Sequence, residues 1–368
     1  MTGFSGLDWV TGKNHTPVYV LSAGDENINT RIQNRLIALT LTDNRGFEAD
    51  QLDIELDDSD GLLALPRRGM TLSLHLGWAG ETLHHKGQFI IDEIEYSGAP
   101  DKITLRARSA DFRATLNLSR EMSYHQKTLS DIVRTIAQRN NLQPEVDQTL
   151  AAVRLNHIDQ TQESDGSFLT RLAKQEGAIA TVKNGYLLFI RQGQNQAASG
   201  RPLPKVTLTR QSGDGYRFSL ADRSAYTGVS ASWLNTRDPQ QKTQVTVKRK
   251  RRKPASQPKP EEKQGDYLVG SEGNVLVMKH TYANKANAER AAKAEWEKIQ
   301  RGVASFSLQL AKGRPELFPE TPVRVSGFKP QIDGADWTLV TVTHTLNDSG
   351  LTTALELEVK ISDADMGV

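Results

Sequence analysis

Six consecutive cations form the densest charge cluster in the sequence, and phosphate binding is the chemistry that such a cluster favours. They are Lys248, Arg249, Lys250, Arg251, Arg252 and Lys253. Because lysine and arginine clusters bind phosphates and release counterions, contact with an anionic partner, either DNA or an acidic surface, is one interpretation of these residues. A plain solvated loop is the favoured interpretation. The run has no interleaved aromatic residue for base stacking, which argues against sequence-specific DNA reading. One of the functions that the sequence leaves open is nevertheless that of a nucleic-acid-binding regulatory protein that acts through this basic run.

Paired carboxylates form a second group with chemical potential, because two of them at a fixed separation serve as acid and base in glycosidases. Asp92 with Glu95, and Glu163 with Asp165, are such pairs. A peptidoglycan hydrolase is therefore a second alternative. However, nearby pairs arise by chance among 44 acidic residues, and the chain has no nucleophile elbow, metalloprotease helix or phosphate-binding glycine loop. We predict that the protein is not an enzyme.

Two short motifs contain metal-ligand residue types but lack the spacing of a metal site. Asp57–Gly61 is rich in aspartate, but placing Gly61 at the sixth position of a calcium loop puts Leu56 at the first and Arg67 at the twelfth, where carboxylates are required. His84 and His85 are adjacent, and neighbouring residues of a strand point to opposite faces. We therefore predict no metal and no cofactor, and interpret Asp57–Gly61 as a turn.

Composition fits a soluble protein assembled in a reducing compartment. The 368 residues contain no cysteine, 37% hydrophobic and 24% charged residues, and a net charge of +2. The absence of cysteine removes disulfides and thiolate chemistry. We see neither a signal peptide nor an apolar run of the roughly 20 residues needed to span a bilayer, so we predict no membrane insertion.

The first 111 residues favour antiparallel β structure. Period-two or β-rich runs are separated by Gly-, Asp- and Asn-containing turns. The runs are Leu36–Leu41, Leu52–Leu56, Met70–Leu76, Phe89–Ile94 and Ile103–Arg108. Strands that are joined by short turns pair antiparallel, so a barrel or a sandwich is expected over residues 1–111.

A looser copy of this pattern lies near the other end of the chain. Three pieces within residues 66–111 match, in order, Pro319–Ser326, Asp336–His344 and Leu351–Asp363. Any two antiparallel meanders look similar at this level; the alternative is an internal duplication. We assign a second β domain to residues 206–240 and 303–368.

Residues 112–205 between these parts predict a mixed α+β domain. A helix is expected over Leu129–Asn140, and a second begins at Ser164 or Asp165, buries Phe168, Leu169, Leu172 and Ala173, and ends at Gly177. A strand follows at Ala178–Val182, and Asn184-Gly185 indicates a hairpin turn. Residues 192–204 are polar, contain glycine and proline, and are expected to act as a linker.

Residues 241–302 interrupt the second β domain. The six cations and the proline-rich residues after them predict a solvated, disordered loop over 248–263. A helix rich in Ala, Glu and Lys is predicted over 284–300, with five residues available to pack against a barrel: Ala288, Ala291, Ala292, Ala294 and Trp296.

The order of these parts carries a family resemblance. The Thr128–Ala137 helix, the Glu163-Ser164-Asp165 helix and the Gly185–Phe189 strand, together with Gly6–Pro17 and Leu317–Val323, resemble the late control D proteins of contractile-tailed phages. Those proteins are baseplate hub proteins and are similar to the N-terminal hub region of VgrG of type VI secretion. The resemblance covers essentially the whole chain. Its motif residues are Glu163, Ser164, Asp165, Phe168, Leu169, Leu172 and Gly177, which we expect to stabilise the middle domain.

The resemblance implies a mainly β fold with α+β insertions: two tail-tube-like antiparallel β-barrel domains plus a mixed α/β middle domain. It implies a structural role in a trimeric ring that joins the six-fold tail tube to the three-fold spike and lines the DNA exit path. Two similar barrels in each of three subunits would make six similar positions around such a ring. The regulatory protein and a tail-associated peptidoglycan hydrolase remain the alternatives.

The partners and location follow from the same resemblance. We expect a homotrimer that binds the tail tube protein, the tail spike protein and other baseplate proteins, with non-specific contact to DNA in the lumen. The protein is expected in the virion tail baseplate after assembly in the host bacterial cytoplasm.

Overall fold

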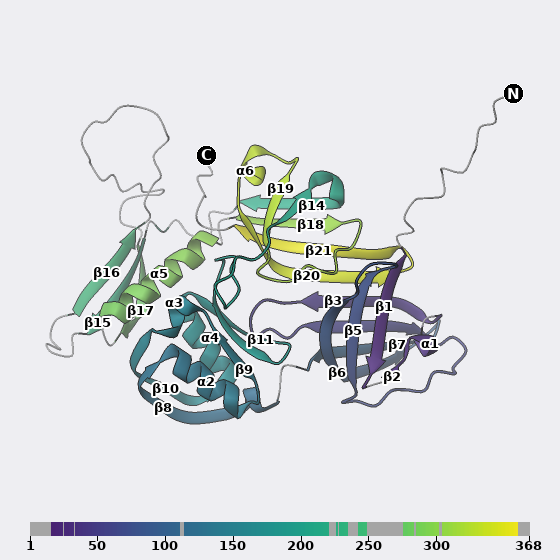
Figure 1. Ribbon diagram of the computed structural model, residues 1–368, viewed down its shortest axis with the longest axis horizontal. Helices are drawn as coiled ribbons and strands as arrows, with labels where there is room; N and C mark the ends of the chain where they lie inside the picture. The colour runs from purple at the N-terminus through teal and green to yellow at the C-terminus, as the bar shows by residue number, and fades with distance from the viewer. Residues whose placement is uncertain are drawn as a thin grey trace.

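The computed structural model describes residues 16–24, 26–32, 34–110, 114–220, 226, 228–234, 242–248, 275–282, 285–301 and 304–359. Most of the described chain is β structure, as the sequence predicts. Thirteen strands form one large sheet, and three smaller sheets complete the fold. Figure 1 shows two β domains side by side, with the helical parts of the molecule on one side of them.

The first β domain contains seven strands and two short helical segments. It comprises β1 (Pro17–Ala23), β2 (Glu26–Asn27), α1 (Asn29–Ile32), β3 (Leu36–Asp43), β4 (Gln51–Asp57), β5 (Thr71–Trp78), β6 (His84–Ser97), β7 (Lys102–Ser109) and η1 (Ala114–Asn117). All five β runs predicted from the sequence lie in β3 to β7. Alternate side chains such as Leu52, Ile54 and Leu74 are fully buried in one core, which is what period-two alternation produces on a sheet with one covered face.

The second β domain surrounds a separate core centred on Trp337 and Phe306. It comprises β13 (Val206–Thr209), η2 (Arg210–Ser212), β14 (Gly213–Leu220), β18 (Ala304–Leu310), β19 (Pro322–Ser326), α6 (Pro330–Asp333), β20 (Trp337–Asn347) and β21 (Gly350–Val359). Strand β20 pairs antiparallel with β3, which joins the two β domains into one sheet.

The two β domains repeat one set of strand pairings. The antiparallel pairs β3·β4, β4·β7, β7·β6 and β6·β5 correspond to β14·β18, β18·β21, β21·β20 and β20·β19. Two β-bulges also coincide: Ile37 and Asp214 bulge in one pair of equivalent strands, and Asp92 and Val340 in the other. The internal similarity predicted from the sequence is therefore a shared architecture in the structure. One pairing differs, because β1 lies antiparallel to β5 whereas β13 lies parallel to β19.

The middle domain packs two long helices against two small sheets. It comprises β8 (Ser119–Thr128), α2 (Leu129–Arg139), β9 (Gln143–Val146), α3 (Gln148–Ala151), β10 (Arg154–Ser164), α4 (Asp165–Glu176), β11 (Ala178–Lys183) and β12 (Tyr186–Arg191). Both predicted helices and the hairpin are confirmed. Asn184 and Gly185 have φ of 51° and 80°, as a type I′ turn requires.

A third sheet and the longest helix form the inserted part of the chain. Strands β15 (Gly228–Leu234), β16 (Lys242–Lys248) and β17 (Val275–Tyr282) pair with one another and pack against α5 (Lys285–Arg301). The helix and its five buried residues are confirmed.

Two expectations about this part need correction. Residues 206–240 were assigned to the second β domain, but β15 belongs to the small sheet, because it pairs with β16 and β17. The helix was expected to pack against a barrel, yet α5 covers the small sheet and contacts α4 instead. The sequence did not show that β15 and β16 form a hairpin of their own.

Gly177 allows α4 to end against α5, and its replacement tests that contact. The residue has φ of 65°, and an added Cβ would lie 3.3 Å from Cβ of Ala294 on α5. Gly185 has φ of 80° with nothing within 4 Å of an added Cβ. We expect Gly185→Ala to cost about 1 kcal/mol of unfolding free energy through backbone strain alone. Gly177→Ala should cost roughly 2 kcal/mol, because steric crowding is added. Equal losses in urea denaturation would contradict the close α4–α5 contact.

Candidate functional site

The junction between the β domains is the candidate site, because it is where the two repeated parts of the chain are held together. Six residue pairs join β20 to β3, from Val342 opposite Asp43 to Asn347 opposite Ala38. Leu346 and Leu351 from the second domain lie in the core cluster of the first. The hydrophobic interior therefore continues across the junction.

Side chains of the first β domain bind backbone carbonyls of the second. Trp78 Nε1 donates to the carbonyl oxygen of Gly313 at 3.0 Å, and Lys86 Nζ donates to those of Pro315 and Leu317, both at 3.1 Å. Burial lowers the pKa of Lys86. These bonds satisfy loop carbonyls that lie beside the junction, and so hold the β18–β19 connection against the first domain.

Four charged residues from three parts of the chain meet at one end of the junction. Arg45, between β3 and β4, pairs with Glu320 at 2.5 Å and with Glu358 of β21 at 2.6 Å. Arg301, at the end of α5, lies 4.0 Å from Glu358. The backbone N–H of Gly193 donates to Glu320, and burial raises the pKa of Glu320. Such a buried network fixes the relative position of its members, because each charge needs its partners.

The middle domain is attached to the first β domain through β11. Lys183 Nζ lies 2.7 Å from Asp43 and 2.5 Å from Asp50, and Thr181 Oγ1 donates to the carbonyl oxygen of Gly46 at 2.6 Å. Burial and the neighbouring charge of Asp43 raise the pKa of Asp50 to about 6. Burial lowers the pKa of Lys183, but the charges of Asp43 and Asp50 outweigh it, so that the pKa is raised.

The motif residues on α4 organise the interior of the middle domain. Ser164 is the N-cap, and its Oγ accepts from the backbone N–H of Ser167 at 3.1 Å. Asp165 is fully buried. It accepts from Arg139 Nε, Asn140 Nδ2 and Gln160 Nε2, each at 2.9 Å.

The other motif residues lie around this cluster. Phe168, Leu169 and Leu172 are fully buried in the middle-domain core, and Gly177 has the left-handed conformation that ends α4. Glu163 binds Arg171 in a partly exposed ion pair. That these residues stabilise the middle domain remains a prediction.

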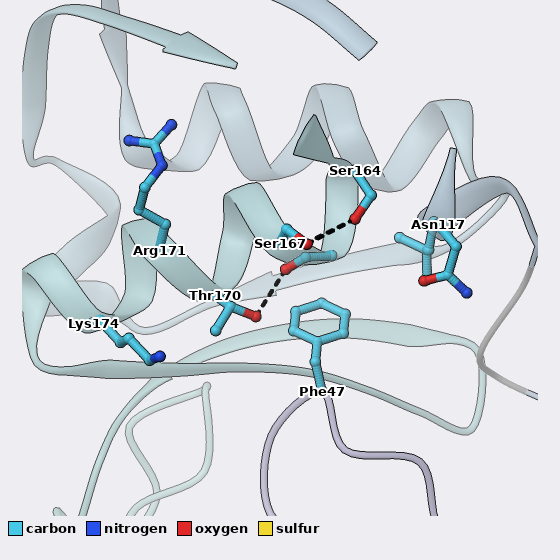
Figure 2. A pocket seen from close by; sticks show the side chains of 9 residues that line it. Phe47, Asn117, Ser164, Ser167, Thr170, Arg171 and Lys174 are labelled. Atoms are coloured by element: carbon cyan, nitrogen blue, oxygen red, sulfur yellow. Dashed lines mark hydrogen bonds between the residues drawn. The ribbon is translucent and has the colours of Figure 1, made fainter. Parts of the chain in front are cut away.

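A hollow of about 490 Å³ lies between α4 and Phe47 of the first β domain. Figure 2 shows the hydroxyls of Ser164, Ser167 and Thr170 on one side of it, with Arg171 and Lys174 further along the helix. The hydroxyls are satisfied within the helix, since Ser164 bonds Ser167 and Thr170 bonds the carbonyl of Gly166. The hollow has no carboxylate in its lining, so it lacks the paired carboxylates that a glycosidase uses.

The carboxylates considered for catalysis lie in ion pairs instead of a shared cleft. Asp92 pairs with Arg108, Glu95 with Arg106, and Asp165 with Arg139. His75 lies beside His85, with ring centroids 4.8 Å apart. In the described ranges no group of three His, Asp or Glu residues is placed to hold a metal ion. Nor does any helix there have the length and apolar character to cross a membrane.

The basic run is described only at its first residue. Lys248 ends β16, whereas Arg249, Lys250, Arg251, Arg252 and Lys253 lie outside the described residues. The expected loop at 248–263 is otherwise outside them too, as is most of the Gly6–Pro17 stretch.

Comparison with known proteins identifies the class to which this architecture belongs. Residues 39–350 match the family model described as phage tail baseplate hub (GPD). The chain belongs to this family, and the protein is a baseplate hub protein of a phage tail, so its place is the virion tail and its partners are tail components.

Individual relatives agree with this family. The probable baseplate hub protein of Escherichia phage 186 is 52% identical, covering 98% of this chain and 97% of the relative. A tail protein of Neisseria meningitidis MC58 shares the fold with a TM-score of 0.66 at 12% identity, over 93% of this chain and 96% of that chain. A chain of the Francisella PdpA–VgrG complex does so with a TM-score of 0.54 at 8% identity, over 95% and 54%.

Sequence reasoning missed the charged residues that hold the parts together. Arg45, Glu320, Glu358 and Lys183 contact partners more than a hundred residues away, and each stands in the sequence as an ordinary surface charge. The only sequence signal for the junction was the internal repeat. The repeat aligned the two β domains with each other, but it did not show which strand of one domain would pair with which strand of the other.

Asp165 tests whether the motif stabilises the middle domain. We expect Asp165→Asn to lower the unfolding free energy by about 3 kcal/mol or more, because it removes the buried charge that Arg139, Asn140 and Gln160 satisfy and leaves the partly buried guanidinium of Arg139 without its counter-charge. The matched control is Glu163→Gln, which removes a partly exposed pair and should cost less than about 1 kcal/mol. Chemical denaturation followed by circular dichroism measures both values. Similar small losses would show that the Asp165 cluster adds little stability.

His344 gives the junction a pH dependence. This residue of β20 is fully buried, and its Nδ1 lies 2.9 Å from Thr353 Oγ1. Burial, together with the nearby charge of Lys86, lowers the pKa of His344 well below its ordinary value of 6.5. The stability that its neutral form provides is thus fully present above pH 6.5 and is lost as the pH falls towards the folded-state pKa.

Replacing His344 should remove this pH dependence. Between pH 7.5 and 5.5 we expect the native protein to lose about 1.4 kcal/mol more unfolding free energy than His344→Leu, as linkage for one histidine predicts. Denaturant titrations at both pH values give the comparison. Parallel losses in the two proteins would show that His344 is not responsible.

Proposed function

We propose that three copies of this hub protein form a closed ring that joins the six-fold tail tube to the three-fold spike. The supporting observation is the repeated register of the two β domains, which extends to both bulges. Since each chain carries two equivalent β domains, three chains supply six similar positions. A face with six similar positions can bind a six-fold tube.

The remaining parts of the chain supply the change of symmetry. The middle domain and the β15–α5 insertion occur once per chain, so they repeat three times around such a ring. Surfaces built from them suit a three-fold spike, whereas surfaces built from the β domains suit the tube. Closed rings of this kind arise when each copy presents two different surfaces that meet head to tail.

The lumen of this ring serves as the exit path for DNA after the spike leaves. The cations Lys248–Lys253 contact the passing DNA or an anionic partner surface, because such a run binds phosphates without reading sequence. The protein acts through binding surfaces and performs no catalysis, and it assembles in the cytoplasm of the bacterial host.

The solution mass tests this function. Light scattering on a sizing column should give three times 40.8 kDa, and negative-stain images of the peak should show rings. The same measurement is then made with purified tail tube and spike proteins, since those surfaces add to the stability of the ring. A monomeric mass in the presence of both partners would contradict the proposed ring.

A further inference from the structure

Among the strand edges that are open in the described part of the chain, two occupy equivalent positions to the strands β20 and β3 that join the β domains. Strand β14 is an edge strand of the large sheet and pairs on one side only, with β18. Strand β6 pairs with β5 and with the neighbouring Met70 only as far as Ile91. Its segment Asp92–Ser97 has β7 on one side and no strand on the other. Open edges invite pairing with another chain, so folded proteins cover or block them.

The strands equivalent to these two edges are already paired with each other within the chain. Strand β20 is the equivalent of β6, and β3 is the equivalent of β14. The equivalence includes backbone bonds: Gly69 N–H donates to Ile91 O at 2.8 Å, and Glu320 N–H donates to Leu339 O at 2.9 Å. Beyond Leu339, β20 uses its free side to pair with β3. Beyond Ile91, the corresponding side of β6 is open.

We propose that Asp92–Ser97 of β6 pairs antiparallel with β14 of a second copy of this chain. The proposal rests on the ring described above and states how its subunits join. Because equivalent strands pair in the same register in both β domains, the register between β20 and β3 can be transferred, residue by residue, to β6 and the partner's β14. This transfer fixes the residues that face one another. Ile94 lies opposite the partner's Leu220, Glu95 opposite the partner's Ser219, Tyr96 opposite the partner's Phe218, and Ser97 opposite the partner's Arg217.

Apolar exposure at the two open edges fits this pairing. Tyr96 is 53% exposed, and Tyr216 and Leu220 of β14 are each 49% exposed. The positions equivalent to Tyr96 and Tyr216 at the internal junction are His344 and Leu39, both fully buried. An edge-to-edge contact would bury these side chains in the same way and remove their apolar surface from water.

On the face of the strands opposite to Tyr96 and Tyr216, polar residues distinguish the contact within a chain from the proposed contact between copies. Inside the chain, Thr343 and Thr345 face Thr42 and Thr40, which is a neutral contact. Between copies, Glu95 and Ser97 face the partner's Ser219 and Arg217, so the guanidinium lies diagonally opposite a carboxylate. Opposite charges in neighbouring positions stabilise one register over a slipped one. The contact between copies is therefore more selective than the contact within a chain.

Disulfide formation tests the register, because the native chain contains no cysteine. Glu95→Cys with Ser219→Cys places the two thiols directly opposite across the proposed contact. Within one copy, six strands of the large sheet lie between β6 and β14, so a disulfide between these two strands must join two copies. Glu93→Cys with Arg217→Cys is the matched control. Its cysteines lie four residues out of register, about 13 Å along the strand, beyond the reach of a disulfide.

Mild oxidation followed by non-reducing electrophoresis gives the result, with circular dichroism confirming that each variant folds. We expect the Glu95–Ser219 variant to give covalent species up to three chains, and the control to stay at one chain. A trimer by light scattering without this cross-link, or with a stronger cross-link in the control, would overturn the edge pairing and leave the ring intact. A monomer without a cross-link, in the presence of purified tail tube and spike proteins, would overturn both.

A charge on the open edge gives an independent measurement. Tyr96→Asp and Leu220→Asp should each weaken association at least tenfold, because a carboxylate would be buried among apolar side chains. Met122→Asp is the control, since Met122 is 43% exposed and lies on β8 of the middle domain, in neither of the two edge strands. Concentration-dependent light scattering compares the three. Unchanged association in both edge variants would contradict the proposed contact.

Discussion

The pairing of β20 with β3 is the interaction on which the rest of the structure depends. Backbone hydrogen bonds fix both the separation and the angle of neighbouring strands, so six residue pairs set the position of one β domain relative to the other. The contacts of Trp78, Lys86 and Arg45 lie around this strand pair and keep it from shifting. Without it, each β domain would be a separate small sheet with its own exposed edges.

The repeated register explains how one chain can serve two symmetries. Equivalent bulges give equivalent curvature, because a bulge bends its strand and increases the local twist. The two β domains therefore present similar outlines even though their side chains differ, as the pairs Leu52 with Phe306 and Thr343 with Glu95 illustrate. The two β domains are therefore similar in backbone structure. Their different side chains determine which contacts are made within a chain and which are made with a partner.

Much of this architecture could be predicted from local sequence patterns. Alternation of apolar and polar residues marked β3 to β7, and the N-cap Ser164 and the terminal Gly177 marked both ends of α4. The burial of Phe168, Leu169 and Leu172 followed from helical spacing. These features depend on residues close together in the chain, so short-range rules are sufficient.

Long-range features could not be predicted in this way. The sequence assigned residues 206–240 to the second β domain, but the pairing of β15 with β16 and β17 instead of β14 depends on three-dimensional packing. The buried cluster of Arg45, Glu320, Glu358 and Arg301 combines side chains from four separate segments. A single sequence contains no pairwise signal that would connect them.

The position of the β15–α5 insertion has a consequence for engineering this protein. In the first β domain the chain passes from β3 to β4 through residues 44–50, whereas the equivalent passage from β14 to β18 spans residues 221–303. Both strand pairs nevertheless keep the same register. The length of this connection is therefore independent of the sheet, as is common for surface connections. The shorter turn is fixed by Lys183 and Thr181, whereas the longer passage already carries a folded unit, so this point of the hub accommodates a large insertion without a change in strand register.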